Sequence, residues 1–162
     1  MRCRVHRRRG LDALTEIFVD GDACPVKDEV YAVAVRHGLA VIIVANQRIN
    51  VPTDLGVEMI VVPNGPDAAD DWIAEEIQAG DIVVTADIPL AARCITVGAS
   101  ALGTNGREFS EESIGGALAT REIKSTLRES GVPTRGPRPL SDRDRSRFSN
   151  ELERIVSRSL RG

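Results

Sequence analysis

Six aspartates fall in three short stretches of the sequence, and their type and spacing point to one kind of chemistry. The stretches hold Asp20 and Asp22, then Asp67, Asp70 and Asp71, and then Asp87. Carboxylates that lie close together repel each other, and their pKa values rise unless a cation lies between them. Their oxygens suit Mg²⁺ or Mn²⁺, which can activate water and polarise a phosphodiester. The pattern favours a metal site for phosphate-ester hydrolysis, while dipole-stabilised helix starts are the simpler interpretation of the middle stretch.

The elements that must position these acids can be predicted from apolar periodicity. Strands are expected at residues 17–19, 39–45, 59–62, 81–85 and 99–102, and helices at 25–37, 67–78, 88–97, 111–130 and from Ser141 onward. In the last helix, Ser141 is a suitable N-cap, and Phe148, Leu152, Ile155 and Val156 form the expected buried face. Short apolar strands that alternate with helices predict an α/β fold with a doubly wound, mainly parallel sheet. Sites in such sheets form beyond the C-terminal ends of the strands, where Asp20 and Asp87 fall.

Composition narrows the class of protein. The 162 residues fit one domain, and no apolar stretch approaches the length of a membrane span. Cys3, Cys24 and Cys94 are widely spaced and lack a histidine cluster, so neither a disulfide framework nor a zinc site is indicated. We therefore expect a soluble, cytoplasmic protein with no membrane partner. Residues 1–14 lack apolar periodicity and are predicted to be a disordered basic extension.

The formal net charge of −3 conceals an asymmetry between an acidic body and a basic C-terminal part. An acidic site repels a polyanion, so a nuclease needs cations nearby to hold the substrate backbone. Arginines cluster within and after a Pro-rich loop, at Arg135, Arg138, Arg143, Arg145 and Arg147. Arg143 and Arg145 are predicted to contact substrate phosphates, because guanidinium groups can donate two hydrogen bonds to one phosphate. The simpler alternative is that these arginines pair with Asp142 and Asp144 on an exposed helix.

Two other residues are candidates for contacts with phosphate. Lys27 lies in the first turn of its expected helix, and Thr85 lies at the end of its expected strand. For Lys27, the simpler interpretation is a solvated side chain on the surface. For Thr85, an equally good interpretation is that its hydroxyl completes the hydrogen bonds at the end of the strand.

Four segments, taken in order, resemble the YaiI/YqxD family of bacterial proteins. They are Phe18–Lys27, Gly65–Asp71, Asp81–Leu90 and Gly136–Phe148. The resemblance covers about residues 15 to 158 and implies one PIN-like domain over that range, which includes the Pro-rich loop and the last helix. PIN-like domains are largely metal-dependent ribonucleases. The resemblance therefore implies Asp20, Asp67 and Asp87 as a catalytic acidic triad that also binds metal, with Asp71 as a fourth ligand. Asp22 and Asp70, which lie beside these acids in the sequence, are secondary acidic candidates.

The sequence thus predicts a nuclease that depends on Mg²⁺ or Mn²⁺ and hydrolyses RNA phosphodiester bonds, with nucleic acid as its partner. A phosphatase of the haloacid dehalogenase type is one alternative, because Asp20 and Asp22 after a strand imitate its D-x-D motif. The order of the remaining motifs disfavours it, since residues 86–106 contain no lysine. A non-catalytic nucleic-acid-binding or regulatory domain is the second alternative. Homo-oligomerisation and protein partners stay open.

Overall fold

The computed structural model describes residues 15–21, 24–52, 56–63, 65, 67–114 and 140–161. The basic extension at residues 1–14, Asp22, the Pro-rich loop before Leu140 and most of the helix expected at 111–130 lie outside these described residues. Only residues 111–114 of that helix are described, and they are helical. The proposed boundaries of the domain stay a prediction.

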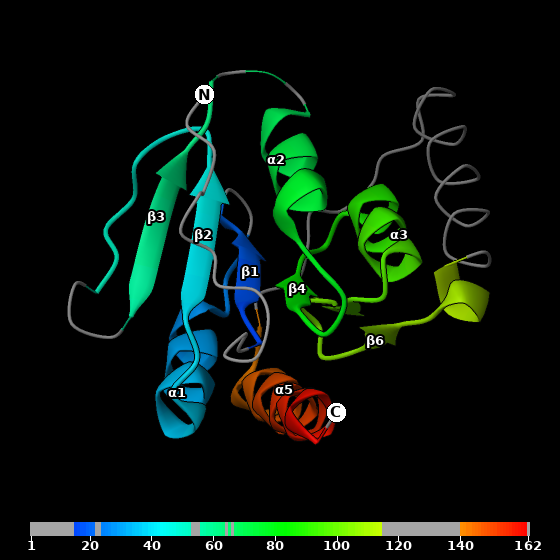
Figure 1. The fold of residues 1–162 in the computed structure, drawn as a ribbon. Helices are drawn as coiled ribbons and strands as arrows, with labels where there is room; N and C mark the ends of the chain where they lie inside the picture. The colour runs from blue at the N-terminus through cyan, green and yellow to red at the C-terminus, as the bar shows by residue number, and fades with distance from the viewer. Residues whose placement is uncertain are drawn as a thin grey trace, which may run out of the picture.

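A six-stranded sheet with the order β3-β2-β1-β4-β5-β6 forms the centre of the molecule (Figure 1). Its strands are β1 (Ile17–Asp20), β2 (Val41–Ala45), β3 (Val57–Val61), β4 (Ile82–Val84), β5 (Ser100–Leu102) and β6 (Glu108–Phe109). All neighbouring pairs are parallel except β5 and β6, which are antiparallel. The central strands β1, β2 and β4 are almost wholly buried, as expected for strands covered on both faces.

Helices cover the sheet on both faces (Figure 1). They are α1 (Lys27–His37), α2 (Ala68–Glu76), α3 (Ile88–Thr96) and α5 (Asp142–Leu160). Side chains alternate along β1, so that Ile17 and Val19 pack with α1 and α5, whereas Phe18 packs with α2 and α3. Two apolar cores result, one on each side of the sheet. The predicted doubly wound α/β fold is confirmed, and it is consistent with a PIN-like domain.

Local bonding explains where the elements differ from prediction. The second strand begins at Val41 instead of Leu39, because Gly38 adopts a left-handed conformation and the Leu39 amide bonds back to the carbonyl of Ala34 at 2.9 Å. Strand β6 was not predicted, since two residues are too short to show alternation. It changes the outer edge of the sheet from a parallel to an antiparallel one.

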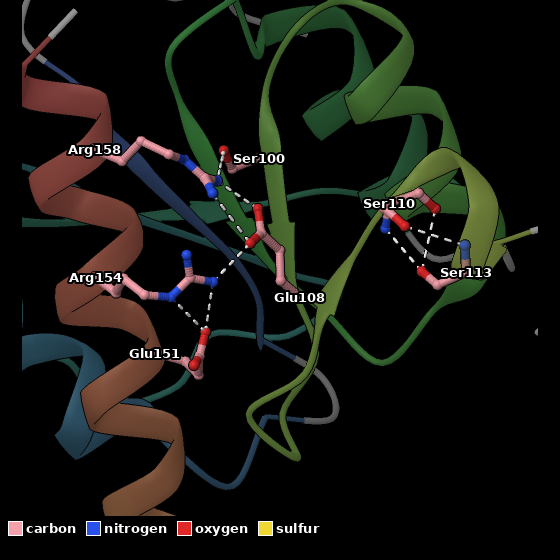
Figure 2. A network of polar contacts seen from close by, with 7 residues as sticks. All are labelled: Ser100, Glu108, Ser110, Ser113, Glu151, Arg154 and Arg158. Atoms are coloured by element: carbon pink, nitrogen blue, oxygen red, sulfur yellow. Dashed lines mark hydrogen bonds and ion pairs between the residues drawn. The ribbon is translucent and has the colours of Figure 1, made fainter.

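The last helix is fixed at both ends. Ser141 and Asp144 form a capping box at its start, and its predicted apolar residues are fully buried. Further along, Arg154 and Arg158 both donate to the carboxylate of Glu108 on β6, and Arg158 also donates to Ser100 on β5 (Figure 2). The helix is therefore tied to the antiparallel edge of the sheet. None of the helices within the described ranges is long and apolar enough to span a membrane.

Candidate functional site

The candidate acids come from three elements that end or begin at one edge of the sheet. Asp20 is the last residue of β1, between β2 and β4. Asp87 follows β4 and is the N-cap of α3, where its Oδ1 accepts a hydrogen bond from the Leu90 amide at 2.9 Å. Asp67 is the N-cap residue of α2, and Asp70 lies in the first turn of that helix. Parallel strands bring their C-terminal ends to the same edge, which places these side chains near one another.

Thr85 joins two of these acids. Its side chain is buried, with 1% of its surface exposed, and its hydroxyl donates to Asp20 Oδ2 at 3.2 Å. The Thr85 hydroxyl oxygen also accepts a hydrogen bond from the Asp87 amide at 2.9 Å. The hydroxyl hydrogen is thus engaged in a hydrogen bond within the protein, which fits the interpretation that Thr85 completes the hydrogen bonds at the end of the strand. A contact between Thr85 and substrate phosphate stays a prediction.

Asp70 has a strongly altered ionisation. Its pKa is raised to about 7, first because burial disfavours the charged form, and then because of the negative charges of Asp87 and Asp20. A side-chain hydrogen bond with Asp87 and the charge of Asp67 raise the pKa further. These four aspartates, Asp20, Asp67, Asp70 and Asp87, are here called the acidic cluster. Burial and the neighbouring acids thus favour the protonated form of Asp70, which relieves the repulsion among them.

Asp71 has a different environment from its neighbour Asp70. Its Oδ1 pairs with Arg93 Nη1 on α3 at 2.8 Å, and the two side chains are 55% and 47% exposed. Asp71 therefore makes an ion pair on the surface between α2 and α3. Its predicted role as a metal ligand stays untested, but its observed partner is an arginine, whereas Asp70 interacts with the other acids.

The basic residues that were predicted to contact phosphate have different surroundings in the structure. Lys27 Nζ donates to the Cys24 carbonyl at 2.8 Å. Arg145 donates to the Pro25 carbonyl and to Glu29 Oε1, at 3.0 and 3.2 Å, which fastens α5 to the start of α1. Arg143 is exposed, so the two arginines that were predicted to act together lie in different environments.

The residues of the acidic cluster fit a divalent cation in the chemistry of their donor atoms, which are all carboxylate oxygens. Their geometry is more open than a finished site, since no group of three or more His, Cys, Asp or Glu side chains among the described residues is arranged to hold a metal. Asp70 and Asp87 are in direct contact through a side-chain hydrogen bond. A cation with a high charge density would take the place of the proton that Asp70 holds.

Comparison with known proteins gives the chain its relatives. A family model described as "Uncharacterized BCR, YaiI/YqxD family" matches residues 18–158. The chain belongs to this family. It is 56% identical over 149 residues to a UPF0178 protein of Rhodopseudomonas palustris, which covers 92% of this chain and 91% of the relative. It is 54% identical over 148 residues to a UPF0178 protein of Paramagnetospirillum magneticum, with 91% and 98% covered.

Family membership confirms the resemblance read from the motifs. These relatives carry no activity in their names, and no solved structure matches the chain. The functional argument therefore rests on the site itself. The sequence pointed to Asp20, Asp67 and Asp87 but treated Asp70 as secondary, although its place beside the apolar stripe of its helix was the signal that it faces inward.

Proposed function

We propose that the chain is a metal-dependent phosphodiesterase of the nuclease class that hydrolyses RNA. The observation that supports this most is the convergence of Asp20, Asp70 and Asp87 from three separate elements. Thr85 bonds to Asp20 and to the Asp87 amide, and Asp70 bonds to Asp87. Acids are rarely gathered in this way for stability alone, since their repulsion costs free energy. Each member also lies at the sheet edge where doubly wound folds place their sites.

We assign the metal-binding role to Asp20, Asp70 and Asp87, with Asp67 beside them. A divalent cation held there would neutralise the carboxylates, lower the pKa of a water molecule and stabilise charge that develops on the phosphate. The donor set contains oxygen atoms alone, which favours Mg²⁺ or Mn²⁺ over softer metals. Asp71 is placed outside the set because its carboxylate is engaged by Arg93.

The protein's own groups orient the acids. Thr85 fixes the Asp20 carboxylate and the backbone at Asp87 through the same hydroxyl, so the two acids cannot move apart independently. Asp70 hydrogen-bonds to Asp87, which orients its carboxylate toward the other acids of the set. His37 lies elsewhere, paired with Glu153 between α1 and α5.

The proposal is tested by metal binding and by cleavage. Millimolar Mn²⁺ is expected to raise the melting temperature, since an ion that binds only the native state stabilises it by mass action. Cleavage of a labelled single-stranded RNA is expected to require Mg²⁺ or Mn²⁺ and to be lost in Asp20→Asn. An unchanged melting curve in Mn²⁺, together with no heat of binding in calorimetry, would refute the metal site.

Binding experiments with the same protein distinguish the two alternative functions, a phosphatase and a non-catalytic domain. Beryllofluoride imitates an aspartyl phosphate, so tight binding to the wild type but not to Asp20→Asn would favour the phosphatase. Metal-independent binding of RNA, with no cleavage in any divalent cation, would favour a non-catalytic domain.

A further inference from the structure

Three arginines lie at the end of the sheet that carries the acidic cluster, on the face that α5 covers. Arg107 ends the loop that follows β5, and Arg143 and Arg147 lie on the first turns of α5; all three are exposed. The loop rests directly on the helix, because a Cβ atom at Gly106 would lie 3.1 Å from Arg147 Cγ and 3.1 Å from the Phe148 nitrogen. Arg107, next to Gly106 in the chain, is thereby brought alongside Arg147. We call these three residues the arginine corner.

The arginine corner differs from four other arginines of α3 and α5 in having no acidic partner among the described residues. Arg93, Arg145, Arg154 and Arg158 each pair with a carboxylate. Within the described part of the chain, the guanidinium groups of Arg107, Arg143 and Arg147 make neither an ion pair nor a hydrogen bond. Arg143 and Arg147 are four residues apart on one helix face, where like charges are destabilising.

The position of the corner relative to the acidic cluster follows from the sheet. The Thr85 amide donates to the carbonyl of Leu102, the last residue of β5, at 3.1 Å. The loop after β5 therefore begins next to Thr85. Thr85 in turn contacts Asp20 and Asp87. The start of α5 is held at the same edge, since Arg145 bonds to Pro25 at the entrance to α1. The arginine corner and the acidic cluster thus lie at the same end of the sheet, toward the faces covered by α5 and by α2 and α3, respectively.

We infer that the arginine corner binds the phosphate backbone of single-stranded RNA and leads it to the acidic cluster. This inference rests on the proposed function, because it supplies the cations that a negatively charged site needs to hold a polyanion. Guanidinium groups suit phosphate through their planar pairs of donors. Three of them spread over a loop and a helix match successive phosphates of a chain better than a single phosphate ion.

The test measures RNA binding in a background that does not cleave. Asp20→Asn protein is titrated with a short fluorescein-labelled single-stranded RNA, and anisotropy is recorded from about 50 to about 200 mM salt. Arg143→Glu and the double variant Arg107→Ala/Arg147→Ala are compared with Arg161→Ala. Arg161 is an exposed arginine on the same helix, about 27 Å from Arg143 at 1.5 Å per residue, and it serves as the matched control. Melting curves verify folding, and Mn²⁺ titrations of the same arginine variants with Asp20 kept verify the acidic cluster.

Both corner variants are expected to weaken RNA binding at least tenfold, while Arg161→Ala leaves it unchanged. The log–log dependence of affinity on salt is expected to flatten by about 0.7 for each lost phosphate contact, so by about 1.4 in the double variant. Equal affinity and equal salt dependence in the folded variants would overturn the inference. Binding of polyglutamate in place of RNA would also overturn it and would assign the corner to an acidic protein. RNA binding that depends on the corner, without cleavage by the wild type, would keep this inference and refute the proposed function.

Discussion

The acidic cluster and the contact between α5 and β6 both gather ionisable side chains, but they treat charge in opposite ways. In the α5–β6 contact, Glu108 accepts from Arg154 and Arg158, and these hydrogen bonds and positive charges outweigh partial burial and lower its pKa (Figure 2). In the acidic cluster, burial and neighbouring negative charges raise the pKa of Asp70 to about 7. In the α5–β6 contact, opposite charges hold two elements together. In the acidic cluster, like charges weaken the fold unless a cation or a proton binds there.

This contrast separates groups that stabilise the fold from groups available for chemistry. Side chains that complete each other's hydrogen bonds have little left to offer a ligand. Carboxylates that repel one another bind a cation or a proton strongly, because the ligand removes the repulsion. The four predictions that follow test this distinction, beginning with the largest effect.

Asp87→Asn is expected to lower the rate of metal-dependent RNA cleavage by about a hundredfold or more. This is within the range of rate enhancement that proton-transfer and charge-stabilising groups contribute. Asparagine is as good an N-cap as aspartate, so α3 and the melting temperature of the apo protein are expected to persist. Cleavage rates and melting curves are measured together. Glu108→Gln is the matched control, in which cleavage is expected to be kept. Loss of cleavage in the control alone would reverse the assignment of the two regions.

Glu108→Ala is expected to lower the free energy of unfolding by about 1 to 2 kcal/mol, because hydrogen bonds to charged groups are lost and two arginines lose their acceptor. Urea denaturation measures the change. Arg161→Ala, at the exposed end of the same helix, is expected to change little. A Glu108→Ala protein with wild-type stability would show that the α5–β6 contact does not hold the helix.

The two regions are also expected to have opposite pH dependence. The folded Asp70 keeps its proton between its ordinary value of 3.8 and about 7, where the unfolded chain has lost it. This group therefore makes the apo protein less stable as pH rises through that interval, by of order 1 kcal/mol after allowance for solvent screening. Asp70→Asn is expected to flatten the decline, as measured by urea denaturation at several pH values.

Glu108 contributes in the other direction. Its folded pKa lies below the ordinary value of 4.5, so its stabilisation is present above that pH and is lost as pH falls through the folded pKa. Glu108→Gln is expected to remove this acid-side loss and to leave the decline from pH 4 to 7 in place. If both variants changed the same part of the pH profile, the electrostatic contrast between the two regions would be wrong.

Asp71→Asn is expected to have the smallest effect, within about 0.5 kcal/mol, because its ion pair with Arg93 is exposed. Calorimetry of Mn²⁺ binding gives the sharper result. Asp70→Asn is expected to weaken Mn²⁺ binding, whereas Asp71→Asn is expected to leave it nearly unchanged. Stronger loss in Asp71→Asn would restore Asp71 as the ligand and move Asp70 out of the site.

The sequence alone determined the features that depend on short-range patterns. Runs of β-branched apolar residues predicted the buried parallel strands, and helical spacing predicted which residues of α5 are buried. Ser141 was recognisable as an N-cap because its partner Asp144 is only three residues away. The same local reading placed Asp20 and Asp87 at strand ends and so indicated the edge of the sheet that carries the site.

Only the tertiary structure decided which neighbours each charged residue meets. Asp70 and Asp71 are adjacent in sequence, but successive residues of a helix point about 100° apart, so the rotation of α2 on the sheet sends one to the acidic cluster and the other to Arg93. Arg143 and Arg145 are separated in the same way. Strand β6 and its tie to α5 join residues 46 and 50 positions apart, and no local pattern contains a partner at that distance.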